Sequence, residues 1–205
     1  MKTLALLFSL FVFSFKVFST EPTSWDFDKA HSNILFSVSH MVISEVSGSF
    51  KKYDGNVIVK NDDFSDSKIE LTIDASSINT DNEGRDKHLK SDDFFNAEKF
   101  PSITFKSKSF KKVGEHKYKL VGDLTIRDVT KEVEWDATFG GTATAWGSTH
   151  AGFKVIGSLN RFDYNLKWNK TIETGGLVAG DVVTITANIE LAQHKEKTEI
   201  EEKKK

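Results

Sequence analysis

The 205-residue chain contains no cysteine, which excludes disulfide bonds, thiolate metal sites and a cysteine nucleophile. Proline is almost as scarce, because the chain has only two residues of this type. A strong charge of one sign is also missing: the formal net charge is −2, and no basic patch with interleaved aromatic residues stands out. We therefore do not expect nucleic acid as a partner.

Long hydrophobic runs are equally rare, and the one that is present lies at the start of the chain. A basic residue, Lys2, precedes an apolar run over residues 4–15, and small residues follow. This pattern predicts a secretory signal peptide over residues 1–19. A membrane anchor is the alternative, but the run is too short for ~30 Å of hydrocarbon and Lys16 interrupts it. We expect a periplasmic or secreted protein whose mature chain has no membrane span.

The rest of the chain is dominated by alternating apolar and polar residues, the period of a β-strand with one covered face. Residues 33–40 (NILFSVSH), 68–74 (KIELTID) and 132–139 (EVEWDATF) alternate over their whole length. Roughly eight to ten such segments, joined mostly by short turns, favour an antiparallel meander that closes into a barrel or packs as a sandwich.

Two glycine-containing stretches predict where the strands turn. Asp54-Gly55 predicts the turn of a hairpin over residues 45–60, because a tight hairpin needs positive φ angles. The glycines between residues 140 and 147 predict a loop. The last residues, 193–205, carry mixed charge and one apolar side chain, which is typical of a flexible, solvated tail.

The covered face of these strands is rich in large residues, since 12 of the 17 Phe and all four Trp follow the leader. A wide barrel that side chains do not fill encloses a ligand cavity. Periodicity alone does not distinguish such a cavity from the solid core of a sandwich, so both interpretations stay open at this level.

One stretch, residues 77–105, departs from the alternation and holds the densest set of charged, His and aromatic residues. Around residues 81–96 we predict a short helical insertion. Thr80 followed by Glu83 fits a capping box at its start. Pro101 ends the insertion, because a proline forces the preceding residue into an extended conformation.

Four segments together resemble the YceI-like family. They are DKAHSNILFSVSH (28–40), SINTDNEGRDKHLKSDDFFNAEKFPSITF (77–105), GDLTIRDVTKEV (122–133) and AGFKVIGSLNRFDY (151–164). The resemblance runs in order from about Trp25 to Leu191. It implies an all-β fold: an extended, lipocalin-like antiparallel barrel of about eight strands, here over residues 23–192, with the helical segment at one side. It also implies a secreted or periplasmic protein that carries a long isoprenoid or similar amphiphile and has no established enzymatic activity.

We therefore predict binding, carriage or storage of a long apolar lipid in a barrel tunnel outside the cytoplasm. The expected ligand is an isoprenoid, a quinone-like lipid or a fatty amphiphile; no other cofactor is expected, and homodimer formation stays open. The predicted ligand-binding residues are Phe36, Val38, Phe50, Leu71, Ile73, Phe94, Phe95, Phe105, Leu124, Trp135 and Phe153. Each is also an ordinary core residue if the barrel is packed solid, and the protein would then be an interaction module.

An enzyme on the same scaffold is the second alternative, and its candidate residues lie in the insertion. On a helix over residues 85–90, His88 lies near Arg85, and Asp86 would orient His88 as an acid or base. No Ser or Cys nucleophile pattern accompanies them. We predict that these three residues fasten the helix to the barrel rim and that the protein is not an enzyme.

Six histidines raise the question of a metal site: His31, His40, His88, His116, His150 and His194. No two of them stand at the i, i+2 or i, i+4 spacing, and an HExxH pattern is absent. Histidines on neighbouring strands are distant in sequence, so three of them can still meet in space, but the spacing predicts no metal site.

Overall fold

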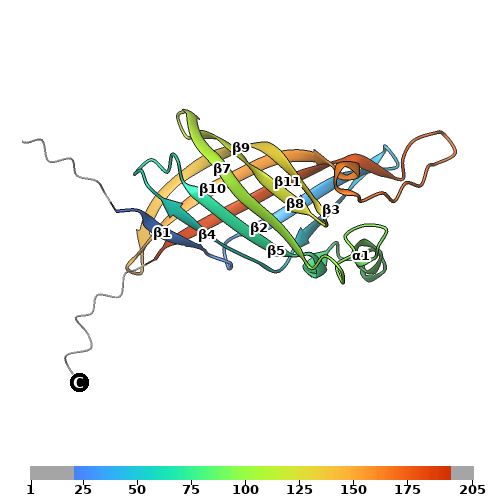
Figure 1. Cartoon of the computed structure of the whole chain (residues 1–205), viewed down its shortest axis with the longest axis horizontal. Helices are drawn as coiled ribbons and strands as arrows, with labels where there is room; N and C mark the ends of the chain where they lie inside the picture. The colour runs from blue at the N-terminus through green and yellow to red at the C-terminus, as the bar shows by residue number, and fades with distance from the viewer. Residues whose placement is uncertain (1–20, 195–205) are drawn as a thin grey trace, which may run out of the picture.

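The structure, a computed structural model, describes residues 21–194 and is dominated by one long antiparallel barrel (Figure 1). The strands are β1 (Thr23–Phe27), β2 (Asn33–His40), β3 (Ser44–Phe50), β4 (Tyr53–Val59), β5 (Lys68–Asp74), β6 (Ile78–Asn79), β7 (Ser102–Gly114), β8 (Lys117–Ile126), β9 (Val129–Ala145), β10 (Ser148–Asn160) and β11 (Ala179–Gln193). The helical segments are η1 (Ala75–Ser77), α1 (Glu83–Lys90) and η2 (Arg161–Tyr164). The predicted signal peptide, and the predicted tail beyond residue 194, lie outside the described residues.

The strands form a ring of eight long strands that follow one another in chain order. β1 and β2 both pair with β11, and therefore form two consecutive sections of one long strand. β3 and β4 form the next long strand of the ring, since β3 pairs with β2 and β4 pairs with β1. β5 and β6 form the third in the same way. The pairing of β1 with β11 closes the ring, which confirms the predicted all-β barrel of about eight strands.

The predicted hairpin over residues 45–60 is wrong. β3 and β4 do not pair with each other, and Asp54 and Gly55 lie inside β4. A glycine is needed at position 55 because the neighbouring strand leaves no room for a side chain, and not because the chain turns there. A Cβ at this position would lie 2.3 Å from the carbonyl oxygen of Glu70 on the neighbouring strand.

The predicted loop between residues 140 and 147 is also wrong in extent. β9 continues through Gly140 and Gly141 to Ala145, and only Trp146 and Gly147 form the turn. Gly141 has a φ of +115° and lies beside a shift in the register between β9 and β10. A β-bulge explains this glycine, because the extra residue of a bulge often needs a positive φ.

The short helix in the insertion is confirmed, but its predicted cap is not. α1 begins after Asn82, whose side-chain oxygen accepts a hydrogen bond of 2.9 Å from the backbone N–H of Arg85. Thr80 lies before the cap, so the capping box with Glu83 does not form. Turns occupy residues 91–99, and β7 starts directly after Pro101 as predicted.

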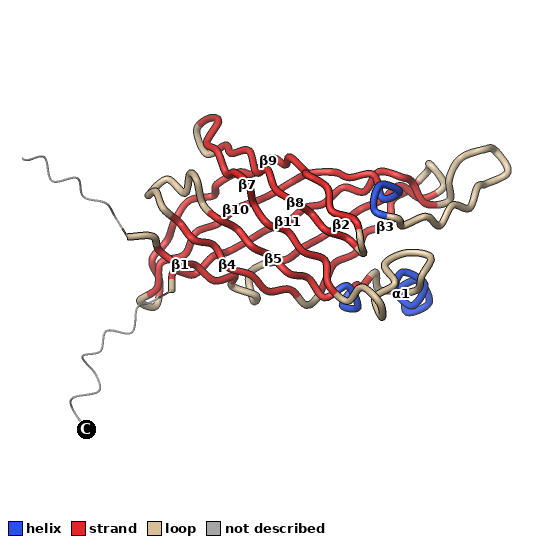
Figure 2. Tube along the Cα trace, in the orientation of Figure 1, coloured by secondary structure: helices blue, strands red, loops and turns tan. Residues whose placement is uncertain are grey.

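The two ends of the barrel differ in what fills them. All helical segments gather at one end, and β1 lies at the other (Figure 2). Near β1 the interior is packed with aromatic rings: Phe64 contacts Trp25, Phe139 and Phe153 with ring centroids 5.2–5.4 Å apart. We call this set, with Phe110 and Tyr118, the aromatic plug. Aromatic contacts of this kind stabilise a core beyond the area they bury.

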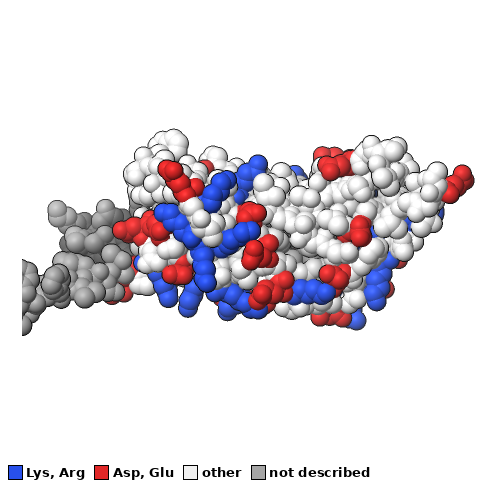
Figure 3. Space-filling view, turned by 90° about the horizontal axis from the view of Figure 1, so that it is seen from above, with Lys and Arg blue, Asp and Glu red and all other residues white. Residues whose placement is uncertain are grey.

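The outer face of the barrel carries cross-strand ion pairs. Lys106 pairs with Glu70 at 2.9 Å, and Lys108 pairs with Asp123 at 2.6 Å. On the face shown in Figure 3, cationic and anionic side chains are interspersed. Exposed pairs each contribute about 0–1 kcal/mol, so they favour solubility and strand register more than stability. Among residues 21–194, no helix is long and apolar enough to cross a membrane.

The close contact between Gly157 and the indole ring of Trp135 generates a prediction about stability. A Cβ on Gly157 of β10 would lie 1.8 Å from the Cδ1 atom of Trp135 on β9. Gly157→Ala should therefore lower the free energy of unfolding by about 1–3 kcal/mol, because the indole ring has to shift. Gly152→Ala on the same strand is the control, since a Cβ there meets nothing within 4 Å. Urea denaturation measures both; equal effects would contradict the steric explanation.

Candidate functional site

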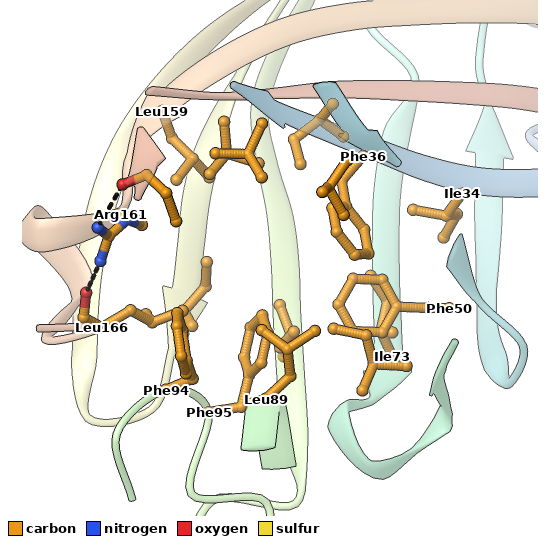
Figure 4. A pocket seen from close by; sticks show the side chains of 18 of the residues that line it. Ile34, Phe36, Phe50, Ile73, Leu89, Phe94, Phe95, Leu159, Arg161 and Leu166 are labelled. Atoms are coloured by element: carbon orange, nitrogen blue, oxygen red, sulfur yellow. Dashed lines mark hydrogen bonds between the residues drawn. The ribbon is translucent and has the colours of Figure 1, made fainter. Parts of the chain in front are cut away.

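A cavity of about 280 Å³ lies inside the barrel at the end that holds α1 (Figure 4). Side chains from the inner face of the strands and from the insertion line it, and they are overwhelmingly apolar. Its volume is close to the lower end of the range for small-molecule sites, about 300–1,000 Å³. The interior of this barrel is therefore not packed solid, unlike the core of a sandwich.

A second, smaller cavity of about 80 Å³ follows toward the aromatic plug. Both cavities share four lining residues, Leu71, Phe105, Trp135 and Ala187, which we call the throat. Within the throat the rings of Phe105 and Trp135 stack at a centroid distance of 5.7 Å and an interplanar angle of 13°. The apolar interior is thus two chambers separated by a stacked aromatic pair.

The structure brings ten of the eleven predicted ligand-binding residues to the larger cavity. They are Phe36, Val38, Phe50, Leu71, Ile73, Phe94, Phe95, Phe105, Leu124 and Trp135. Phe153 instead lines the smaller cavity and packs in the aromatic plug. Contact of any of these side chains with a ligand stays a prediction.

Sequence reasoning missed the contribution of β11 to the cavity. Val183, Ile185 and Ala187 line the larger chamber from this strand. The signal was present, because residues 182–191 alternate as clearly as any other strand. The apolar members of this alternation share one face, which is the face that the barrel covers.

The charged and titratable groups that line the larger cavity are all basic. They are Arg85, Arg161, His40 and His88, and no Asp or Glu lines the cavity wall. The end of the cavity near α1 and η2 therefore carries positive charge in apolar surroundings, where electrostatic interactions are strong.

Arg161 is the most buried of these groups, with 3% of its surface exposed. Its guanidinium donates hydrogen bonds of 2.7–2.9 Å to the backbone carbonyls of Gly180, Ala179, Leu166 and Trp168. Figure 4 shows the bond to Leu166. Burial lowers the pKa of Arg161, and the charge of Asp181 acts in the opposite direction. A guanidinium remains protonated in proteins, so this side chain orders two chain segments and keeps its charge at the cavity.

The three residues considered for catalysis do not form an acid–base group. The carboxylate of Asp86 accepts hydrogen bonds from the backbone N–H and the hydroxyl of Thr80, at 2.9 and 2.6 Å. His88 contacts Asp93 instead, at 2.8 Å. Arg85 donates to the hydroxyl and the carbonyl of Thr80. The hypothesis that Asp86 orients His88 is therefore wrong.

Arg127 has a role that sequence reasoning did not assign. It lies in the turn between β8 and β9, with a φ of +57°. Its guanidinium donates to the backbone carbonyls of Asp92, Phe94 and Asn165, and to the carboxylate of Asp92 at 2.9 Å. The available signal in the sequence was the position of this arginine, directly after the apolar end of β8 at Ile126. These bonds hold the insertion over the cavity, with Phe94 and Phe95 lining it.

The contact between Asp86 and Thr80 generates a prediction. Asp86→Ala should lower the free energy of unfolding by about 1–3 kcal/mol, because it leaves two buried donors of Thr80 without their acceptor. Glu83→Ala, an exposed acidic residue on the same helix, should stay within about 0.5 kcal/mol of the unsubstituted protein. Chemical denaturation of both variants is the measurement, and an unchanged stability of Asp86→Ala would contradict the assignment.

Comparison with known proteins agrees with this architecture. A UPF0312 protein of Staphylococcus aureus (strain N315) is 43% identical over 172 residues, which cover 83% of this chain and 98% of the relative. The crystal structure of the Campylobacter jejuni YCEI protein is 36% identical and superposes with a TM-score of 0.66 over 77% of this chain and 90% of that chain. A polyisoprenoid binding domain from Saccharophagus degradans, at 14% identity, shares the fold with a TM-score of 0.62 over 84% of this chain and 99% of that domain.

The family comparison covers the whole barrel together with its insertion. The family model described as the YceI-like domain matches residues 25–191, which is most of the described chain. These residues contain α1, the lining of both chambers and the eight long strands, except for the first two residues of β1 and the last two of β11. The chain belongs to the YceI-like family.

Proposed function

We propose that this protein binds and carries an amphiphile with a long apolar chain, which it shields from water inside the barrel. The observation that carries this proposal is the enclosed apolar cavity of about 280 Å³ beneath the insertion. Transfer of a chain from water to such surroundings is favourable by about 0.8 kcal/mol per CH₂ group before the costs of ordering are subtracted. The Saccharophagus degradans domain, described as binding polyisoprenoid, supports an isoprenoid as one candidate chain.

The length of the chain depends on the throat. The larger chamber alone has room for roughly ten methylene-sized groups, if each occupies about the 30 Å³ that a water molecule occupies in the liquid. A longer isoprenoid therefore has to displace the stacked rings of Phe105 and Trp135 and enter the second chamber, or extend out past the insertion.

The polar end of the ligand is expected at the mouth near α1. Arg85 and His88 line this part of the cavity, whose lining contains no Asp or Glu, and Asp93 contacts His88 from outside the lining. An oxygen-bearing head group that is anionic or strongly electron-rich complements them, because hydrogen bonds to charged groups contribute about 1.5–3 kcal/mol. Carboxylate, phenol and quinone oxygens all belong to this class.

Carriage outside the cytoplasm, without catalysis, completes the proposal. The leader pattern in residues 1–19 is the support for export. Asp86 and Thr80 are bonded to each other, which leaves Asp86 without a contact to His88 for proton transfer. Asp93, and not Asp86, contacts His88, so the predicted Asp86–His88 pair gives no support to an enzyme that acts on the lipid.

A variant of the throat tests the proposed tunnel. Ala187→Trp fills the connection between the two chambers, so the lipid extracted from the purified protein should become shorter or be lost. Thr186→Trp is the control, because Thr186 is adjacent to Ala187 on β11 and its side chain therefore points to the opposite face of the barrel. Mass spectrometry of organic extracts measures the bound lipid per chain. An unchanged long lipid in Ala187→Trp, or no lipid in the unsubstituted protein, would refute the proposal.

A variant of the mouth tests the head group. Arg85→Gln should weaken binding of a long-chain fatty acid about tenfold, while binding of the matching alcohol changes little, because the lost interaction is with the anionic head. Lys87→Gln removes the same charge from an exposed position on the same helix, outside the cavity lining, and is the control. Displacement of a fluorescent fatty acid measures both affinities. Equal losses for acid and alcohol would contradict a head-group role for Arg85.

A further inference from the structure

A second group of polar side chains lies on the outer face of the barrel, near the end that contains β1. Asp28 and His31 are in the turn between β1 and β2, His150 is on β10 and Glu190 is on β11. Glu190 lies between Ile189 and Leu191, which line the smaller chamber, so its side chain points away from that chamber. This group is therefore separate from the proposed lipid site.

Three of these side chains, Asp28, His31 and Glu190, lie close together, and the fourth, His150, contacts Glu190. The Oδ2 atom of Asp28 is 2.9 Å from the Nδ1 atom of His31. One possible ligand atom each from Asp28, His31 and Glu190 lie within 4.8 Å of one another. On the other side of Glu190, its Oε1 atom is 2.9 Å from the Nδ1 atom of His150. Two imidazole nitrogens and two carboxylates thus come together from three separate parts of the chain.

The ring nitrogen of His150 is an independent indication of a ligand. Its Nδ1 atom is buried and has no hydrogen-bond partner among the described residues. Glu190 lies within ion-pair distance of it, at 2.9 Å, but this contact does not have the geometry of a hydrogen bond. A buried nitrogen of this kind is costly unless another group binds it.

The backbone around the group is held in place before any ligand arrives. The N–H of Asp28 donates to the carbonyl of Glu190 at 2.8 Å. The N–H of Glu190 donates to the hydroxyl of Ser32 at 2.9 Å, and this hydroxyl donates to the carbonyl of Glu190 at 3.2 Å. These bonds fix the turn against β11, so that only side-chain rotations are needed to adjust the four groups.

We propose that Asp28, His31, His150 and Glu190 bind a divalent transition-metal ion, with Zn²⁺ as the best match. Imidazole nitrogen and carboxylate oxygen are both zinc ligands, with bond lengths of about 2.0–2.2 Å in a tetrahedral arrangement. Such bonds place the ligand atoms about 3.5 Å apart, which Asp28, His31 and Glu190 reach from within 4.8 Å by small rotations, and His150 would join them by a rotation from its contact with Glu190. Nitrogen ligands favour zinc, cobalt or nickel over calcium and magnesium, which prefer oxygen.

The position of this site suggests what the ion does. β1 closes the barrel by pairing with the end of β11, through residues from Trp25 to Phe27. A metal ion held by the following turn, by β10 and by β11 would connect this closing pair to the rest of the wall. It would thereby stabilise the end of the barrel that holds the aromatic plug.

Direct titration of the metal-free protein with Zn²⁺ tests the site. Isothermal calorimetry should show one Zn²⁺ per chain, and Co²⁺ in its place should give the visible absorption of a four-coordinate ion with nitrogen ligands. His31→Ala and His150→Ala should each weaken Zn²⁺ binding by about 100-fold or more, because each removes a direct ligand. Glu190→Gln keeps the size of the side chain and should weaken binding in the same direction.

His194→Ala is the matched control. This histidine also pairs with a carboxylate at the same end of the barrel, Asp26 at 3.1 Å, but it is not part of the four-residue group. Its removal should leave Zn²⁺ affinity unchanged. Far-ultraviolet circular dichroism establishes that each variant is folded. Absence of Zn²⁺ binding to the unsubstituted protein, or equal losses in His194→Ala and in folded His31→Ala and Glu190→Gln, would overturn the proposal.

Discussion

The pairing of β1 with β11 is the interaction on which the rest of the structure depends. It closes the ring of strands, so that β1 has a partner on each side and presents no open edge to another chain. Closure also separates an inner face from an outer face along every strand. The inner face holds the aromatic plug and the two chambers, whereas the outer face holds cross-strand ion pairs. Both the proposed lipid site and the proposed metal site depend on the separation of these two faces.

The segments at the cavity end of the barrel, the insertion with α1 and the region around η2, are held in place by polar side chains that hydrogen-bond to the backbone. Arg127 and Arg161 donate to seven carbonyl groups between them, and Asp86 accepts from Thr80. Irregular segments next to a cavity lack the hydrogen bonds of a sheet, so they need such partners. A planar guanidinium suits this role because it donates several bonds in fixed directions. Of these residues, Arg161 also brings positive charge to the cavity wall.

A cavity reduces stability, and the structure compensates at the opposite end. Space without atoms costs roughly 24 cal/mol per Å³ in engineered cores, which amounts to several kcal/mol for a chamber of this size. The aromatic plug packs Phe64 against three rings and closes this end with dense contacts. A bound chain would recover part of the remaining cost, which couples ligand binding to stability.

The sequence by itself determined the local features: strand alternation, the break at residues 77–105 and the family motifs. Alternation also identified part of the cavity lining, because strand residues two apart share a face. Only the tertiary structure decided how strands pair. Asp54-Gly55 has the composition of a turn but lies within β4, because Gly55 has to admit the carbonyl of Glu70. It also decided that Asp86 contacts Thr80 and that His31 meets Glu190, 159 positions later. Closing a barrel brings distant residues together, and no local pattern records that distance.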